Sequence, residues 1–155
     1  MKSFARFLAT LGPTGSAPIA PATAGSALVA ACGWFIPPPA LPVTIALLVV
    51  ATAIAVWAAG EAEKQLGRDA SPIVIDEAIG QSLALLFVPH TIPAFALSFV
   101  LFRIFDIWKP LGAREIQALP GGLGVVADDV IAGFTACGVF HLIAFALHRT
   151  GLHAF

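Results

Sequence analysis

The sequence predicts an all-α integral membrane protein, a bundle of proline-broken helical hairpins plus a C-terminal helix, folded as a single domain over residues 1–155. Hydrophobic residues make up 59% of the chain and charged residues only 11%, against roughly 45–50% and 25% in soluble domains. The mean hydropathy is +0.93. Three long stretches, 7–60, 78–102 and 130–148, contain no Asp, Glu, Lys or Arg. A soluble fold of this size could not cover its surface with so few polar groups, so the bilayer must be part of its solvent.

The N-terminal third is expected to form a retained tail, a loop and the first hairpin. Lys2 and Arg6 precede an apolar run that glycines and prolines interrupt from Gly12 onward, too early for a signal peptide. Residues 25–36 are too few to span a bilayer and end at three consecutive prolines, where a helix must stop. Residues 42–60 approach the ~20 residues that a spanning helix needs. Together these two segments predict a hairpin.

The second apolar stretch, residues 78–102, is interrupted in its middle by Pro89 and Pro93. A hairpin is favoured here, because two prolines four residues apart cost a continuous helix several kcal/mol. Paired, proline-interrupted apolar segments also often mark binding sites in membrane proteins. A single kinked span is the alternative, and it would place the two acidic regions on opposite sides of the membrane. Residues 130–147 are expected to form one final span.

Polar chemistry is concentrated in two short connections. All nine acidic residues fall within 61–77 and 106–129, and seven of the eight basic residues lie in the N-terminal tail or in and beside these regions. In the hairpin arrangement, the tail and both acidic regions share one face of the membrane. Because loops rich in lysine and arginine stay on the cytoplasmic side, this face is expected to be cytoplasmic. A net charge of −1 gives no indication of nucleic-acid binding.

Two charged motifs border the second apolar stretch. Asp76 and Glu77 are adjacent carboxylates at the entrance to an apolar helix, where they are costly unless a cation binds them. The alternative is a helix N-terminal pair that the helix dipole stabilises. Arg103, Asp106 and Lys109 recur three residues apart, which places them on nearly one face of a helix. A carboxylate between two cations suits a site for a metal ion and a phosphate, although local ion pairs at a helix end give the same pattern.

The third charged motif, Asp128 and Asp129, follows the glycine-rich segment 121–124. Glycines let a backbone approach a ligand and offer N–H groups to it, and one of the two aspartates is expected to cap the last helix. The second aspartate indicates a bound cation, and oxygen ligands without histidine or cysteine favour Mg²⁺ over Zn²⁺. Upstream, hydroxyls and N–H groups in the loop 12–26 favour phosphate at a helix start, with an ordinary turn as an equal alternative.

In this order and spacing, the motifs IVIDE-x-x-G, LFR-x-FD-x-x-KP and GG-x-G-x-x-x-DD-x-x-AG resemble those of the phosphatidylglycerophosphatase A family. AP-x-x-P-x-T-x-GS near the N-terminus is similar to the leading motif of the same family, so the match runs from about Gly12 to Gly133. The resemblance implies a helical, Mg²⁺-dependent phosphatase that converts phosphatidylglycerophosphate into phosphatidylglycerol and inorganic phosphate. It further implies a multi-pass protein of the bacterial cytoplasmic (inner) membrane, with its active site facing the cytoplasm.

The resemblance also implies that the matching polar positions form the site. On that basis Mg²⁺ is the expected cofactor, Arg103 and Lys109 balance the phosphate charge, and Asp76 positions or deprotonates the attacking water. The predicted catalytic residues are Asp76, Arg103, Lys109 and Asp128. The predicted metal ligands are Glu77, Asp106, Asp128 and Asp129, and the predicted substrate-binding residues are Thr23, Ser26, Arg103, Lys109, Gly122 and Gly124.

Two other functions are open alternatives. A small ion carrier or channel would use acidic groups at the ends of half-helices, but it predicts functional charge at mid-membrane, whereas these acids lie at segment ends. A catalytically inactive family member is the second alternative, because the family usually has glycine where this chain has Ala22. The predicted partners are the membrane and a phospholipid substrate, without nucleic acid.

Overall fold

The computed structural model describes residues 2–109, 116–117 and 119–151, and these residues form helices and connecting loops without a β-strand. In chain order the elements are α1 (Lys2–Ala9), the 3₁₀ helix η1 (Thr14–Ser16), α2 (Pro21–Phe35), α3 (Leu41–Leu66), α4 (Ile75–Ala84), α5 (Ile92–Trp108) and α7 (Gly122–Arg149). The predicted all-α fold is confirmed.

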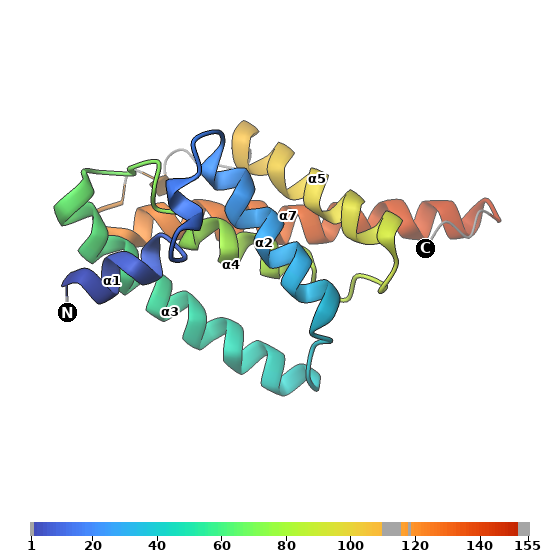
Figure 1. Cartoon of the computed structure of the whole chain (residues 1–155). Coiled ribbons are helices and arrows are strands. Elements are labelled where there is room, and N and C mark those ends of the chain that lie inside the picture. The colour runs from blue at the N-terminus through green and yellow to red at the C-terminus, as the bar shows by residue number, and fades with distance from the viewer. Residues whose placement is uncertain (1, 110–115, 118, 152–155) are drawn as a thin grey trace.

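The chain reverses direction at both proline-rich breaks (Figure 1). Residues 36–40 separate α2 from α3, which carries Pro42 in its first turn. Residues 85–91 separate α4 from α5, and the Thr91 hydroxyl caps α5 by accepting a hydrogen bond from the Ala94 N–H. Proline ends a helix but is tolerated in a first turn, where its missing N–H would have no partner. A single kinked helix across the second apolar stretch is therefore wrong.

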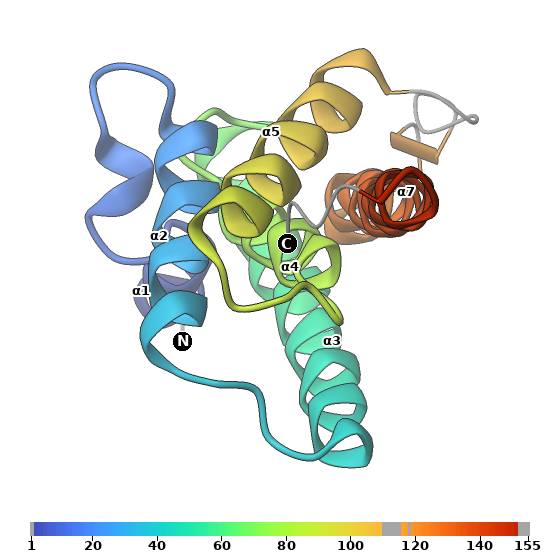
Figure 2. The same ribbon diagram turned by 90° about the vertical axis from the view of Figure 1, so that its right-hand side faces the viewer.

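The first hairpin is splayed, and α4 is the element that contacts α1, α2, α3, α5 and α7. α2 lies apart from α3 (Figure 2) and packs on α4 and α5 instead. α3, α4 and α5 all pack against α7, and α1 packs on α3. The connection between α2 and α3 contains three consecutive prolines, which favour extended backbone over a tight turn. The start of α4, the end of α5 and the start of α7 meet in one region.

Two helices, α3 and α7, are long and apolar enough to cross a membrane. Their most apolar windows have mean hydropathies of 2.3 and 2.1, and only 11% and 22% of these windows are buried in the protein. A core helix of a soluble protein would bury its apolar side chains, whereas these helices present theirs outward, as lipid requires. α7 begins at Gly122, eight residues before the start of the predicted final span, so the charged Asp128 and Asp129 belong to the same helix.

Small residues let the helices approach closely at the charged end of the bundle. A Cβ atom on Gly133 of α7 would lie 2.4 Å from the Gly80 carbonyl oxygen of α4, and one on Gly80 would lie 2.8 Å from the Asp129 carbonyl oxygen. Backbone contact of this kind is the usual role of glycine between membrane helices. The same contact fixes the register of α4 against α7 and so brings their acidic residues together.

The packing of α3 against α7 depends on Gly122, and Gly122→Ala is expected to destabilise the protein. A Cβ atom there would lie 2.0 Å from the Val56 carbonyl oxygen, an overpacking that costs about 1–3 kcal/mol. Gly138→Ala, on the same helix, is the matched control because a Cβ atom there meets nothing within 4 Å. Thermal unfolding in detergent should show a lower Tm for Gly122→Ala alone. Equal Tm values for the two variants would contradict this packing role.

Candidate active site

Seven charged residues from three helices converge at one end of the bundle. Asp76 and Glu77 occupy the first turn of α4, and Asp128 and Asp129 the second turn of α7. The last turns of α5 and its C-cap residue supply the remaining three: Arg103, Asp106 and Lys109. Each of the five acidic residues is at most 9% exposed. Buried carboxylates at this density require compensation by cations.

Three of the carboxylates form a compact cluster. Asp76, Glu77 and Asp129 each offer an oxygen atom, and these atoms lie within 4.8 Å of one another. Asp76 Oδ1, Glu77 Oε2 and Asp129 Oδ2 are buried without a hydrogen-bond partner among the described residues. Native proteins rarely leave buried polar atoms unpaired, and three such oxygens at one place can be satisfied by one shared cation. We refer to these three residues as the acidic cluster.

The pKa values of the two acids at the start of α4 are also consistent with a site for a cation. Burial, together with the charges of Glu77 and Asp129, raises the pKa of Asp76 well above its usual value. Burial also raises the pKa of Glu77, while a hydrogen bond with Asp76 and the charge of Arg103 act in the opposite direction. Two neighbouring acids therefore resist ionisation in this site. A bound cation would reverse that preference, because it favours the charged form of each carboxylate.

The other two carboxylates are paired with cations. Arg103 donates a hydrogen bond to Asp106 within α5. Lys109 donates to Asp128 across the gap between α5 and α7, and its Nζ lies 3.9 Å from Asp106 Oδ1. Burial lowers the pKa of Lys109, but the hydrogen bond to Asp128 and the surrounding acidic charges outweigh it and raise the pKa above the usual value. Lys109 is therefore held as a cation between two helices.

The site as a whole carries an excess of negative charge. Among the described residues, five carboxylates face two basic side chains, so full ionisation of these groups would leave three uncompensated negative charges. An approaching phosphate would be repelled, and weak screening at the edge of a bilayer would make that repulsion strong. A cation bound among these carboxylates would offset that repulsion.

All seven charged residues singled out in the sequence thus lie in one site, but the structure groups them in a way that the sequence did not suggest. Glu77 and Asp129, two predicted metal ligands, are joined in the acidic cluster by Asp76, the predicted base. The predicted ligands Asp106 and Asp128 are instead paired with basic side chains. Which of the five contact a metal ion stays a prediction.

The predicted phosphate loop lies beside the start of α4. A Cβ atom on Gly25 of α2 would be 3.1 Å from the Val74 side chain, directly before α4. The first turn of α2 has no side-chain cap, so its backbone N–H groups are available to an anion. The hydroxyl of the buried Ser26 donates to the Ala22 carbonyl oxygen, and Thr23 lies one turn earlier on the same helix. A contact of Thr23 or Ser26 with substrate stays a prediction.

Ala22, where the family usually has glycine, lies within α2 and is not among the residues with positive φ. A helical position needs no glycine, so alanine is favoured there over glycine. Alanine is therefore unstrained at this position.

The glycine-rich segment before Asp128 forms the start of α7. Gly121, with φ of 64°, is the N-cap of α7, and Gly122 and Gly124 lie in the first turn. Gly122 packs on α3, and a Cβ atom on Gly124 would meet the Gln117 and Leu119 carbonyl oxygens. The prediction that Asp128 or Asp129 caps this helix is wrong, because the helix begins at Gly122. Substrate contact by Gly122 or Gly124 stays a prediction, and their observed contacts are with the protein itself.

One polar residue of the site was missed in the sequence. Gln81 lies one helical turn after Glu77 on α4, is fully buried, and has no hydrogen-bond partner for either amide atom among the described residues. Residues four apart on a helix are neighbours, so its amide lies beside the acidic cluster. A glutamine four residues after an acid, inside an otherwise uncharged stretch, was the signal in the sequence.

We infer that the Gln81 amide binds a ligand of the site, and Gln81→Met is expected to separate activity from stability. An apolar side chain of similar shape removes two unpaired buried groups, so stability should stay equal or rise. Activity should fall about tenfold or more, which corresponds to one hydrogen bond to a charged group. Phosphate release and Tm would be measured together, with Gln65→Met at an exposed position as control. Unchanged activity of Gln81→Met would show that the buried amide has no part in catalysis.

Comparison with known proteins identifies close relatives of the chain. The sequence profile described as "Phosphatidylglycerophosphatase A" matches residues 7–144. An Escherichia coli K12 protein named phosphatidylglycerophosphatase A is 36% identical over 135 residues, which cover 84% of this chain and 77% of the relative. A Haemophilus influenzae protein of the same name is 36% identical over 80 residues, about half of each chain.

A Bacteroides thetaiotaomicron protein shows higher identity, 43% over 146 residues, covering 86% of this chain and 87% of the relative. This relative is named, provisionally, as a phosphatidylinositol-3-phosphatase. No solved structure matches the chain. The relatives therefore agree on phosphatase activity toward a phospholipid and differ in the head group that their names specify.

Proposed function

The chain belongs to the phosphatidylglycerophosphatase A family and is a membrane phosphatase, and on that premise we propose that its substrate is phosphatidylglycerophosphate. Hydrolysis of the terminal phosphate would give phosphatidylglycerol and inorganic phosphate. The acidic cluster beside two basic side chains, at the end of a bundle with two apolar helices, is the observation that supports this proposal most directly.

The donor set fits the Mg²⁺ ion that the family implies. The cluster offers oxygen atoms only, and each of its residues has one buried oxygen without a partner among the described residues. Mg²⁺ prefers carboxylate oxygen and keeps several water ligands. We assign Asp76, Glu77 and Asp129 as the residues that hold it. When bound, the ion supplies positive charge to the phosphoryl oxygens and lowers the pKa of a neighbouring water.

The basic residues would orient the phosphate. Arg103 Nε is buried without a partner among the described residues, although another nitrogen of the same guanidinium donates to Asp106. That free N–H can donate to a phosphate oxygen, and charge-assisted bonds of this kind are strong and directional. Lys109, at the end of α5 and paired with Asp128 of α7, would add a second positive charge. Asp76 has two carboxylate oxygens, so it can face the cation and also accept a proton from the attacking water.

Phosphate release from purified protein in mixed micelles tests the substrate. We expect faster turnover of phosphatidylglycerophosphate than of phosphatidic acid or soluble phosphomonoesters. Phosphatidylinositol 3-phosphate is the second candidate, favoured by the 43% identical relative. It carries its phosphate on a ring carbon, whereas phosphatidylglycerophosphate presents a primary phosphate at the end of a flexible glycerol. Higher kcat/KM for the inositol lipid would reassign the substrate, and equal turnover of a soluble ester without lipid would contradict both.

We also propose a multi-pass arrangement with the site at the cytoplasmic face of the membrane. Both hairpins return the chain to the end that carries most of its basic residues, which stay on the cytoplasmic side. Single cysteines at Gln65 and Thr91, in a background without Cys32 and Cys137, test this. Gln65 should be labelled only from the cytoplasm and Thr91 only from outside. Labelling of both from one side would contradict the arrangement. The same test could be made at Gly112. This position lies outside the described residues.

A further inference from the structure

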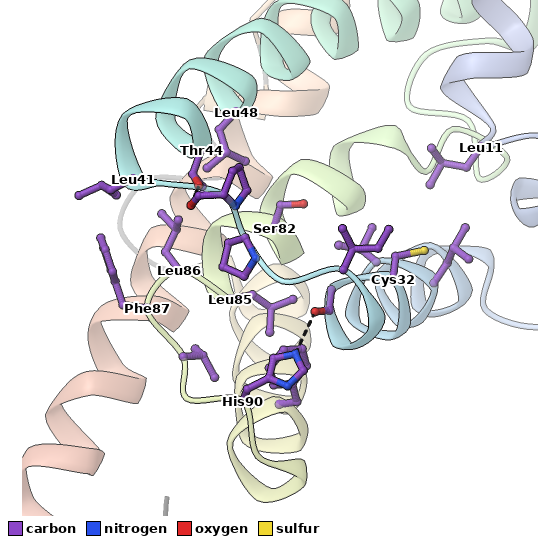
Figure 3. A pocket seen from close by; sticks show the side chains of 18 residues that line it. Leu11, Cys32, Leu41, Thr44, Leu48, Ser82, Leu85, Leu86, Phe87 and His90 are labelled. Atoms are coloured by element: carbon purple, nitrogen blue, oxygen red, sulfur yellow. Dashed lines mark hydrogen bonds between the residues drawn. The ribbon is translucent and has the colours of Figure 1, made fainter.

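An apolar cavity lies away from the acidic cluster. Its volume is about 600 Å³, and α2, the first turns of α3, and the second half of α4 with its following loop line it. Figure 3 shows Leu11 at one end, Leu41 and Phe87 at the other, and Cys32 and Ser82 between them. The cavity therefore extends along α2 and α4, from the charged end of the bundle toward the hairpin turns.

The polar groups of the lining are already occupied. The Thr44 hydroxyl donates to the Pro39 carbonyl oxygen, and the Ser82 hydroxyl donates to the Ala78 carbonyl oxygen. A ring nitrogen of His90 lies 3.3 Å from the Gly33 carbonyl oxygen. Leucine, isoleucine, valine, proline and phenylalanine make up most of the rest. A polar ligand would lose its hydrogen bonds to water here without replacement, so the lining selects an apolar occupant.

The surroundings of the cavity favour one kind of occupant, a hydrocarbon chain of the bilayer. Leu41, Thr44 and Leu48 belong to α3, one of the two helices apolar enough to cross a membrane. The solvent at that depth is lipid. A volume of about 600 Å³ falls within the roughly 300–1,000 Å³ of small-molecule sites.

The cavity also lies along the same face of α2 as Ser26, in the region predicted to bind phosphate. Ser26 precedes the lining residues Val29 and Gly33 by three and seven positions, so these residues share one face of α2. At the same end, Leu11 follows α1, whose last residue Ala9 accepts a hydrogen bond from the Val74 N–H directly before α4. A lipid whose chain lies in the cavity would therefore direct its head group toward the start of α4.

We propose that this cavity binds one acyl chain of the phospholipid substrate and thereby orients the phosphorylated head group toward the acidic cluster. The proposal rests on the proposed function. Moving a chain from lipid into an apolar cavity gains little hydrophobic free energy, because both surroundings are apolar. The benefit is orientation of the head group, which affects the rate at which bound lipid reacts.

The test fills the cavity with a bulky side chain. Cys32 is exposed and lines the cavity, so Cys32→Trp should occupy it. Ala30 is two residues away on the opposite side of α2 and lines a second groove, of about 440 Å³, between α2 and α5. We expect Cys32→Trp to lower kcat/KM for long-chain phosphatidylglycerophosphate about tenfold. A short-chain analogue should lose no more than about twofold, and Ala30→Trp should change neither substrate.

Three results would overturn the proposal. Equal loss with long-chain and short-chain substrates would mean that Cys32→Trp damages the fold rather than a chain site. A larger loss for Ala30→Trp would place the chain in the second groove. Full activity of Cys32→Trp on the long-chain lipid would exclude the cavity as a chain site.

A crosslinking measurement on the unaltered protein separates failure of this proposal from failure of the proposed function. Phosphatidylglycerol with a diazirine at the end of one acyl chain, presented in vesicles, should crosslink preferentially to the segment 82–90. Even labelling of the outward faces of α3 and α7 would show ordinary surrounding lipid and overturn the proposal. Preferential labelling would support the chain site even if phosphatidylglycerophosphate were not hydrolysed. That lack of hydrolysis would remove only the substrate assignment.

Discussion

Asp129→Asn is expected to lower kcat for phosphate release by roughly a hundredfold or more, equivalent to ~3 kcal/mol of transition-state stabilisation. The substitution keeps the shape of the side chain and removes one negative charge from the acidic cluster. Asp129 is 2% exposed and one of its oxygens has no partner among the described residues, so an amide there gains no compensating contact. The cluster would hold its cation more weakly, and the repulsion of the phosphate would then be offset less.

Metal dependence is measured in the same experiment. Activity of the unaltered protein should vanish in chelator and return with Mg²⁺. Mg²⁺ should also raise its Tm, since a ligand that binds only the folded state stabilises it, and the shift should be much smaller for Asp129→Asn. Glu61→Gln is the control, because Glu61 forms a partly exposed ion pair with Lys64 on α3, outside the charged site. Full activity in chelator, or in Asp129→Asn, would falsify the metal assignment and leave the family relationship intact.

Lys109→Gln is expected to have the second large effect, on activity and stability together. Lys109 is the cation that joins Asp106 of α5 to Asp128 of α7. The Asp128 side chain is buried and that of Lys109 is 22% exposed, so removing the lysine should cost about 3 kcal/mol of stability, the lower end of the range for buried pairs, because Asp128 stays buried without compensation. We also expect kcat/KM to fall by about a hundredfold, through loss of a positive charge beside the phosphate.

Two further variants separate the effects of Lys109→Gln. Lys64→Gln removes a cation from an exposed ion pair with Glu61, and such pairs contribute only ~0–1 kcal/mol. It should leave Tm and activity nearly unchanged. Adding Asp128→Asn to Lys109→Gln removes the uncompensated charge, so it should restore part of the stability but none of the activity. Recovery of activity in the double variant would show that Lys109 acts only as a structural partner of Asp128.

Much of the fold followed from the sequence because local rules decided it. The apolar composition required helices, since an isolated segment in lipid must satisfy its own backbone hydrogen bonds. Pro37–Pro39 and the pair Pro89 and Pro93 predicted both chain reversals, because proline cannot continue a helix. The start of the last span was less well predicted. The charged Asp128 and Asp129 do not interrupt this helix, which begins at Gly122.

The sequence by itself determined the fold class, the breaks between helices and the charged residues that form the site. Only the tertiary structure decided how those residues are grouped. The contact of Gly80 with Gly133 sets α4 against α7 and joins Asp76 and Glu77 to Asp129. Lys109 pairs with Asp128, 19 residues away, a contact that no local spacing predicts. Side chains meet according to how closely two backbones approach, and that distance depends on packing between helices remote in sequence.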